Sequence, residues 1–253
     1  MDLITVTNGL FDQPDLVWVL FGFFAGGLVK GVIGLGMPFI AIPVIASVSD
    51  VPTAVGIVAA PSILPNIMQL WVYRMHMERP LTIALICIAT LIGTAVGVHL
   101  LVQIDKQLIN QLLGLLLLTY IATRVLNLQP RLSPLRGAQL AFPTGILSGI
   151  LGGMTGISAP ITLTYLLSLR LKKYGFIFFA SAFFATIGSA QAIFYINANL
   201  ITFQTAAISC FALIPIFLGM KIGGFAVRFI SESFFEKIIF GVLTILAVKF
   251  TIF

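Results

Sequence analysis

The sequence predicts an all-α polytopic membrane protein built from two inverted-topology repeats. Three observations lead to this fold class: the composition, two long apolar runs interrupted by glycine and proline, and a match between the two halves of the chain. Of the 253 residues, 59% are hydrophobic and 9% are charged, whereas a soluble domain has about 25% charged residues. Only lipid can solvate this much apolar surface, so the composition excludes a soluble protein.

Each repeat is expected to contain one broken-helix hairpin followed by three transmembrane helices. The single spans are each near the ~20 residues needed to cross a bilayer. Repeat 1 covers residues 1–126, with the hairpin at 16–48 and spans at 51–72, 81–102 and 108–126. Repeat 2 covers 138–253, with the hairpin at 138–169 and spans at 176–196, 200–220 and 234–252. A cytoplasmic linker, 127–137, joins the repeats. The acidic N-terminal segment disfavours a cleaved signal peptide.

The two hairpins are predicted because runs 16–48 and 138–169 are too long for one span. A straight helix of ~32 residues would measure about 48 Å, well above the ~30 Å hydrocarbon core. Each run is interrupted by a stretch rich in glycine and proline, "KGVIGLGMP" at 30–38 and "GILSGILGGMTGISAP" at 145–160. Both residue types are poor in a helix interior, so each run is expected to break there.

The distribution of Lys and Arg indicates that run 138–169 folds back. If it crossed once, these residues would divide 7 against 6 between the two faces, with Lys30 left out as buried. If it folds back, they divide 11 against 2, and the positive-inside rule favours this arrangement, with the eleven in the cytoplasm. The eleven are Arg74, Arg79, Arg124, Arg131, Arg136, Arg170, Lys172, Lys173, Lys221, Arg228 and Lys237, and the two are Lys106 and Lys249.

The duplication appears when each residue is compared with the one 122 positions later. At this offset Gly34 meets Gly156 and Pro38 meets Pro160. Further matches at this offset are Gln69 with Gln191, Tyr73 with Tyr195 and Gly97 with Gly219. Before the break the offset is 118, and there Gly27 matches Gly145 and Gly31 matches Gly149. Each copy crosses an odd number of times, so the second copy is inverted and hairpin 16–48 enters from outside. Inverted repeats with broken helices are typical of secondary transporters.

The two hairpin tips are expected to meet near the midplane and to form an anion site. The second half-helix of each hairpin begins at its tip, with Pro38 or Pro160 in the first turn and Ser158 as an N-cap. Helix N-termini present free N–H groups and a positive dipole end, which attract anions. Lys30 lies too deep to reach an interface and is expected to contact the anion, whereas its counterpart is Ser148, so the site is asymmetric.

The predicted substrate-binding residues are glycines and prolines at the tips together with polar side chains inside the spans. They are Lys30, Gly34, Gly36, Met37, Pro38, Asn66, Gln69, Gly152, Gly153, Thr155, Gly156, Ser158, Pro160, Ser189 and Gln191. Four glycines at small-xxx-small spacing, Gly27, Gly31, Gly145 and Gly149, are assigned instead to helix packing. Tyr73 and Tyr195 are assigned to interfacial aromatic belts. No catalytic or metal-binding residue is predicted.

The stretches "AGGLVKGVIGLGMPFIAIP" and "GILSGILGGMTGISAPITLTYLL" resemble the paired glycine-rich motifs of the TauE/SafE sulfite exporter family. This family is also called the 4-toluene sulfonate uptake permease family. The resemblance covers nearly the whole chain in length, duplication and motif position. It implies transport of sulfite, sulfoacetate or other organosulfonates in a bacterial inner membrane. No cofactor is predicted.

The leading hypothesis is therefore a secondary transporter that exports small sulfur-containing anions. An anion channel without alternating access is the alternative. A membrane-embedded enzyme is disfavoured because all acidic residues lie at or beyond the ends of the spans. The expected partners are the anion and the lipid bilayer, with no nucleic acid; a homodimer is left open. The absence of acids inside the spans disfavours a carboxylate proton relay. Three mechanisms remain: uncoupled movement of the anion driven by the membrane potential, co-transport of the anion's own proton, and coupling to sodium. We favour the first.

Overall fold

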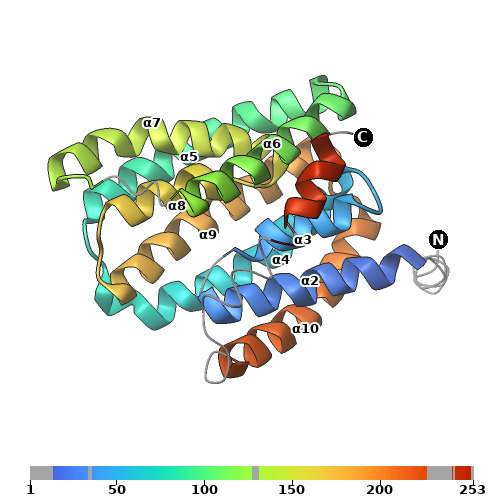
Figure 1. Cartoon of the computed structure of the whole chain (residues 1–253), viewed down its shortest axis with the longest axis horizontal. Helices are drawn as coiled ribbons and strands as arrows, with labels where there is room; N and C mark the ends of the chain where they lie inside the picture. Colours follow the sequence, from blue (N-terminus) through green and yellow to red (C-terminus); the bar gives the residue numbers. More distant parts are fainter. Residues whose placement is uncertain (1–13, 34–35, 127–130, 227–240, 242, 252–253) are drawn as a thin grey trace.

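The computed structural model describes residues 14–33, 36–126, 131–226, 241 and 243–251, and Figure 1 shows their arrangement. Within these ranges the chain is helical and forms no strand, so the predicted all-α class is confirmed. Four helices in these ranges are long and apolar enough to cross a membrane, namely Val51–His76, Pro80–Gln103, Lys173–Asn197 and Thr205–Ala226. The chain is thus an all-α polytopic membrane protein.

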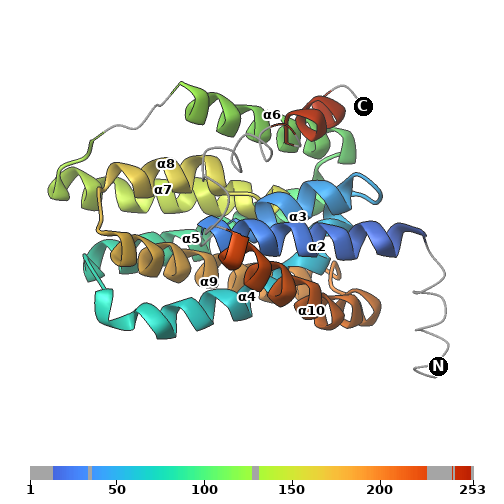
Figure 2. The same ribbon diagram turned by 60° about the horizontal axis from the view of Figure 1, so that its bottom comes forward.

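The first long run forms two antiparallel helices, α2 (Pro14–Ile33) and α3 (Met37–Ala46). A methyl group on Gly26 would lie 2.7 Å from the carbonyl oxygen of Met37, and one on Gly22 would lie 3.2 Å from Val44 and Ile45. Residues late in α2 therefore contact the start of α3, and earlier residues of α2 contact its end, so the two helices are antiparallel. Figure 2 shows the two helices side by side. Gly36 precedes α3 with φ 92°, in the left-handed region that glycine adopts without strain.

The second long run forms helices α7 (Pro134–Thr155) and α8 (Ala159–Ser168). The backbone N–H of Leu132 donates to the carbonyl oxygen of Ser168 at 3.1 Å. The segment before α7 therefore lies beside the end of α8, and the chain leaves this pair at the end where it entered. The turn between the helices contains Gly156 with φ 72°.

The break in the second run is shorter than the sequence indicated. Helix α7 continues through most of the stretch 145–160, and only 156–158 separate it from α8. The glycines inside α7 allow close packing on helix α5 (Pro80–Gln103): a methyl group on Gly145 would lie 2.6 Å from the carbonyl oxygen of Ile86, and one on Gly149 would lie 2.5 Å from that of Thr90. Their small size serves helix–helix contact, and the helix keeps its backbone hydrogen bonds in hydrocarbon.

The same packing recurs where α2 meets helix α10 (Phe203–Ala226). Gly27 lies against the backbone of Ile216, and Gly31 lies against that of Met220. The assignment of Gly27, Gly31, Gly145 and Gly149 to helix packing is thus confirmed. The first helix of each pair packs on a long helix from the other half of the chain, α2 on α10 and α7 on α5, as Figure 1 shows.

Helices α4 (Val51–Tyr73) and α9 (Lys173–Asn197) pack against each other and complete the centre of the bundle. A short 3₁₀ turn, η1 (Arg74–His76), extends α4, and helix α6 (Lys106–Val125) follows α5. Residues 243–251 are also helical. Residues 234–240, 242 and 252 of the predicted span 234–252 lie outside the described residues, as do Gly34 and the part 127–130 of the linker.

Contacts near the helix ends show which of them lie together at each end of the bundle. At one end, Lys106 forms a salt bridge of 2.6 Å with Asp50, and Lys249 donates to the carbonyl oxygen of Ser47 at 2.7 Å. At the other end, the Arg79 guanidinium donates to the carbonyl oxygen of Leu169 at 3.1 Å. The turn after α3 thus lies with the loop before α6, whereas the end of α8 lies with the loop before α5.

Candidate functional site

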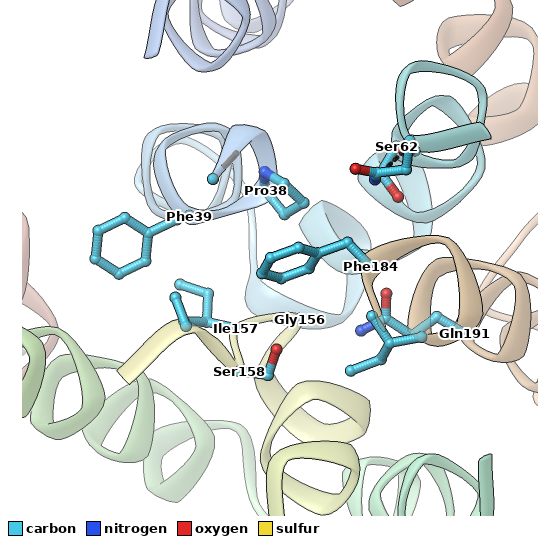
Figure 3. Close-up of a pocket in the computed structure, with 12 residues that line it drawn as sticks. Pro38, Phe39, Ser62, Gly156, Ile157, Ser158, Phe184 and Gln191 are labelled. Atoms are coloured by element: carbon cyan, nitrogen blue, oxygen red, sulfur yellow. Dashed lines mark hydrogen bonds between the residues drawn. The ribbon is translucent and has the colours of Figure 1, made fainter. Parts of the chain in front are cut away.

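The tips of the two helix pairs meet at a small cavity in the centre of the bundle. Figure 3 shows the turn 156–158 facing Pro38 and Phe39 across it, with side chains from α4 and α9 on a further side. The cavity volume is about 20 Å³. Its lining comes from both tips and from both central helices: Gly36, Pro38, Phe39, Ser62, Asn66, Gly156, Ile157, Ser158, Ala159, Phe184, Ile187 and Gln191.

Both short helices begin at this cavity. Pro38 lies in the first turn of α3 and Pro160 lies in the first turn of α8, as predicted. Ser158 occupies the N-cap position of α8, but its side chain makes no capping hydrogen bond. Because first-turn N–H groups have no acceptor inside their own helix, the N–H groups at Met37 and Ala159 are available at the two helix starts. Each helix directs the positive end of its dipole to the same small space.

Helix α9 holds the end of α7 in place with two side chains. The Gln191 amide donates to the carbonyl oxygen of Gly152 at 2.7 Å, and the Tyr195 hydroxyl donates to that of Gly153 at 2.9 Å. Tyr195 is fully buried, so its assignment to an interfacial belt is wrong. A carbonyl group near a helix C-terminus lacks an intrahelical partner, and a buried hydroxyl supplies one.

Lys30 lies behind the cavity, not on its wall. Its side chain is 3% exposed and donates to Asn66 Oδ1 at 2.8 Å and to Gln69 Oε1 at 3.0 Å. The Ser181 hydroxyl of α9 also donates to Gln69 Oε1, at 3.1 Å. Asn66 is both a partner of Lys30 and a part of the cavity wall, so it connects the lysine to the cavity.

Six of the predicted residues line the cavity: Gly36, Pro38, Asn66, Gly156, Ser158 and Gln191. Lys30, Gln69, Gly152 and Gly153 form a layer behind it, through the hydrogen bonds just described. The Thr155 hydroxyl is used inside the turn, where it accepts from the N–H of Ile157 at 3.2 Å. Met37, Pro160 and Ser189 do not line the cavity, and Gly34 lies outside the described residues.

Sequence reasoning missed six lining residues: Phe39, Ser62, Ile157, Ala159, Phe184 and Ile187. Helical spacing would have found two of them. Ser62 lies four residues before Asn66, and Ile187 lies four residues before Gln191, so each shares a helix face with a residue that was predicted. The others are apolar, and their residue type alone does not mark them as part of a polar site.

A family model described as "Sulfite exporter TauE/SafE" matches residues 18–250 of this chain. The match includes both helix pairs, both tips and the central helices α4 and α9. No curated protein and no solved structure matches the chain.

Proposed function

Since this chain belongs to the sulfite exporter TauE/SafE family, we propose that it is a secondary transporter for small sulfur-containing anions such as sulfite, sulfoacetate or other organosulfonates. The proposed direction is export across a bacterial inner membrane. The anion is held between the starts of α3 and α8, in the cavity where both tips meet. The observation that carries this proposal is the convergence of two helix N-termini on one cavity whose wall includes the polar side chains of Ser62, Asn66, Ser158 and Gln191.

The donors at the cavity suit an oxyanion or sulfonate group. A side-chain amide has two N–H donors, and Gln191 uses one of them on Gly152 while Asn66 uses one on the carbonyl oxygen of Ser62. Each amide therefore retains a donor for a ligand, and Ser158 adds a hydroxyl group. No acidic side chain lines the cavity in the part of the chain that the structure describes. A negatively charged ligand is thus met by donors and dipoles without a repelling carboxylate.

The size of the cavity indicates that the tips must separate for a substrate to enter. A volume of about 20 Å³ holds roughly one water molecule. A methyl group on Gly156 would collide with Ile42 of α3 and Val55 of α4, so the two tips are in close contact. We infer that movement of one helix pair relative to the other opens the site, as alternating access requires.

We also propose roles for predicted residues that lie behind the cavity, and an arrangement of the two halves of the chain in the membrane. Lys30 contributes positive charge behind Asn66 when the anion is bound, and Gly152 and Gly153 allow the end of α7 to approach the site. The two halves of the chain are inverted repeats, residues 1–126 and 138–253. The ends of α7 and α8 near Leu132 and Ser168 face the cytoplasm. The two packings of α2 on α10 and of α7 on α5 support the repeat, because they are equivalent under it.

Binding and transport are tested separately. Thermal unfolding of the detergent-purified chain is measured with sulfite, thiosulfate, sulfate, sulfoacetate, taurine and acetate. We expect one or more of the sulfur oxyanions to raise the unfolding temperature and acetate to have the smallest effect. Gln191→Leu should remove the effect, whereas Gln103→Ala, at an exposed amide near the end of α5, should retain it. Equal stabilisation of the wild type and Gln191→Leu would place the anion elsewhere.

The alternative function, an anion channel, is distinguished by counterflow in proteoliposomes. A transporter with alternating access accelerates uptake of labelled anion when unlabelled anion is trapped inside, and its flux saturates. An open channel shows neither property. The close contact of the two tips favours the transporter, because a channel requires a continuous path.

A further inference from the structure

The buried lysine of this site has hydrogen-bond partners that match an uncharged amine. The two acceptors of Lys30 are amide oxygens, on Asn66 and Gln69, and both are neutral. A neutral amine has two N–H groups, so two acceptors satisfy it. An ammonium group has three N–H donors, and no third acceptor for Lys30 is found within the described part of the chain.

Among the described residues, none supplies a counter-charge to Lys30. Its side chain is buried, and no salt bridge to it is formed among the described residues. An unpaired charge in an apolar interior is strongly disfavoured, and such a group loses its charge unless an opposite charge arrives. Without a bound anion, these surroundings therefore favour the amine form.

No titratable group in the described residues of the neighbouring helices α3, α4, α9 and α10 takes this role instead. Helix α3 carries none. The titratable or charged groups on α4, α9 and α10 are Tyr73, Lys173, Tyr174, Tyr195, Cys210 and Lys221. Cys210 and Lys221 are exposed, Tyr73 stacks on Tyr174, and Tyr195 donates to Gly153. None of these groups forms a described contact with Lys30.

An anion in the cavity would supply the missing charge. Asn66 lines the cavity and accepts from Lys30, so a bound anion lies one amide side chain away from the amine. The attraction between an anion and an ammonium group is strong where water is excluded. Ligand binding then favours the protonated form of Lys30, and protonation favours ligand binding in return.

We propose, building on the function proposed above, that the transporter takes up one proton on Lys30 when it binds its anion. Water on the open side of the site gives a proton to the Nζ lone pair, and the amine becomes an ammonium group. The proton leaves when the anion is released on the other side. A monovalent anion thus crosses together with one positive charge, and transport follows the combined gradients of anion and proton without net charge movement.

This coupling differs from the three possibilities that the sequence left open. It needs no carboxylate relay, because the lysine itself carries the proton. It also does not depend on the acid–base chemistry of the substrate, so it applies to sulfonates that remain ionised at every physiological pH. The membrane potential alone would then have little effect on the flux of a monovalent anion.

The test is a count of protons during binding to the full chain in detergent, with methanesulfonate as the probe. Methanesulfonate stays ionised, so any proton taken up is taken up by the protein. Titration calorimetry in two buffers with different ionisation enthalpies gives the number of protons per bound anion. We expect close to one proton in neutral to alkaline solution, and a Kd that rises about tenfold per pH unit in that range.

Three variants assign the proton to Lys30. Lys30→Met and Lys30→Arg should each bind without net proton uptake, the first more weakly than the wild type, since neither side chain titrates in this range. Lys221→Met, at an exposed lysine of α10, should take up the same number of protons as the wild type. Proton uptake that persists in both Lys30 variants would overturn the proposal.

The wild-type titration also separates this inference from the proposed function. Anion binding without net proton uptake contradicts the proton-coupled mechanism and leaves the anion site intact. Failure of methanesulfonate and of every sulfur oxyanion to bind contradicts the proposed function, and the inference is refuted with it.

Discussion

The hydroxyl group of Tyr165 donates a hydrogen bond of 2.6 Å to the backbone carbonyl oxygen of Gly137. Tyr165 lies near the end of α8 and Gly137 lies near the start of α7, so this bond joins the two ends of the second helix pair. The chain between them has reached the cavity at 156–158 and returned. The segments on either side of the pair therefore lie at the same end of the helix bundle.

The first prediction concerns membrane topology. Single cysteines replacing Leu135 and Lys172 are placed in a background without Cys87 and Cys210; both new positions are exposed. We expect both to be shielded from an impermeant thiol reagent in intact cells, because the 11-to-2 charge distribution places them in the cytoplasm. A cysteine replacing the exposed Gln107, in the first turn of α6 beside Lys106, is the control and should be labelled. Labelling of Leu135→Cys but not Lys172→Cys would contradict the helix-pair topology.

The second prediction concerns Lys30. Lys30→Ala should weaken anion binding while the fold is retained, because the variant loses the charge behind Asn66. A hydrogen bond to a charged group contributes about 1.5–3 kcal/mol, which corresponds to roughly a ten- to hundredfold increase in Kd. Isothermal titration of wild type and variant gives this ratio. Unchanged affinity would refute a role of Lys30 in binding.

The third prediction concerns the turn at Gly156. Gly156→Ala places a side chain at φ 72°, where the left-handed conformation costs about 1–2 kcal/mol, and the methyl group meets Ile42 and Val55. We expect a lower thermal unfolding temperature and weaker anion binding, because the two tips are forced apart. Gly224→Ala is the control: its nearest described atom is 3.8 Å away, and alanine should leave stability unchanged or raise it. Equal stability of the two variants would argue against close contact of the tips.

The fourth prediction concerns the dependence of stability on pH. Burial tends to raise the pKa of Asp50, whereas hydrogen bonds from Lys106 and Thr53 lower it. Together the hydrogen bonds have the larger effect, so the pKa of Asp50 lies below its ordinary value. A carboxyl group with a lowered pKa in the folded state stabilises the protein above its unfolded pKa, and this contribution is lost as the pH falls through the folded pKa. Thermal unfolding of wild type and Asp50→Asn should therefore differ near neutral pH and converge in acid, below about pH 4. If the unfolding temperatures of wild type and Asp50→Asn differed equally at all pH values, the ionised Asp50 carboxylate would not be the source of the stabilisation.

The sequence predicted the fold class and the family well because both depend on features spread over the chain. Composition alone required membrane helices, and the glycine motifs at both tips indicated the family. The two prolines also located the starts of α3 and α8 correctly, since proline fits the first turn of a helix and little else in hydrocarbon. These are local properties that need no knowledge of distant contacts.

The sequence was less informative where a residue's role depends on its neighbours in space. Tyr195 lies near the end of α9, as an interfacial tyrosine would, but the carbonyl group of Gly153 is beside it and accepts its hydroxyl. The glycines of α7 suggested a break, yet α5 packs against them and the helix continues. Lys30 was correctly identified as buried. Asn66 of α4 separates it from the cavity, and this depends on which residues of distant helices meet in the fold.

We propose that the anion binds between the starts of α3 and α8, and the position of a bound ligand tests this directly. The most direct measurement is anomalous diffraction from crystals of the protein with 2-bromoethanesulfonate, after calorimetry has shown that this ligand binds. We expect one strong bromine peak next to the cavity lined by Asn66, Ser158 and Gln191, and no peak at that position in Gln191→Leu. A ligand that binds in solution but gives its bromine peak outside the two tips would show that the anion site lies elsewhere.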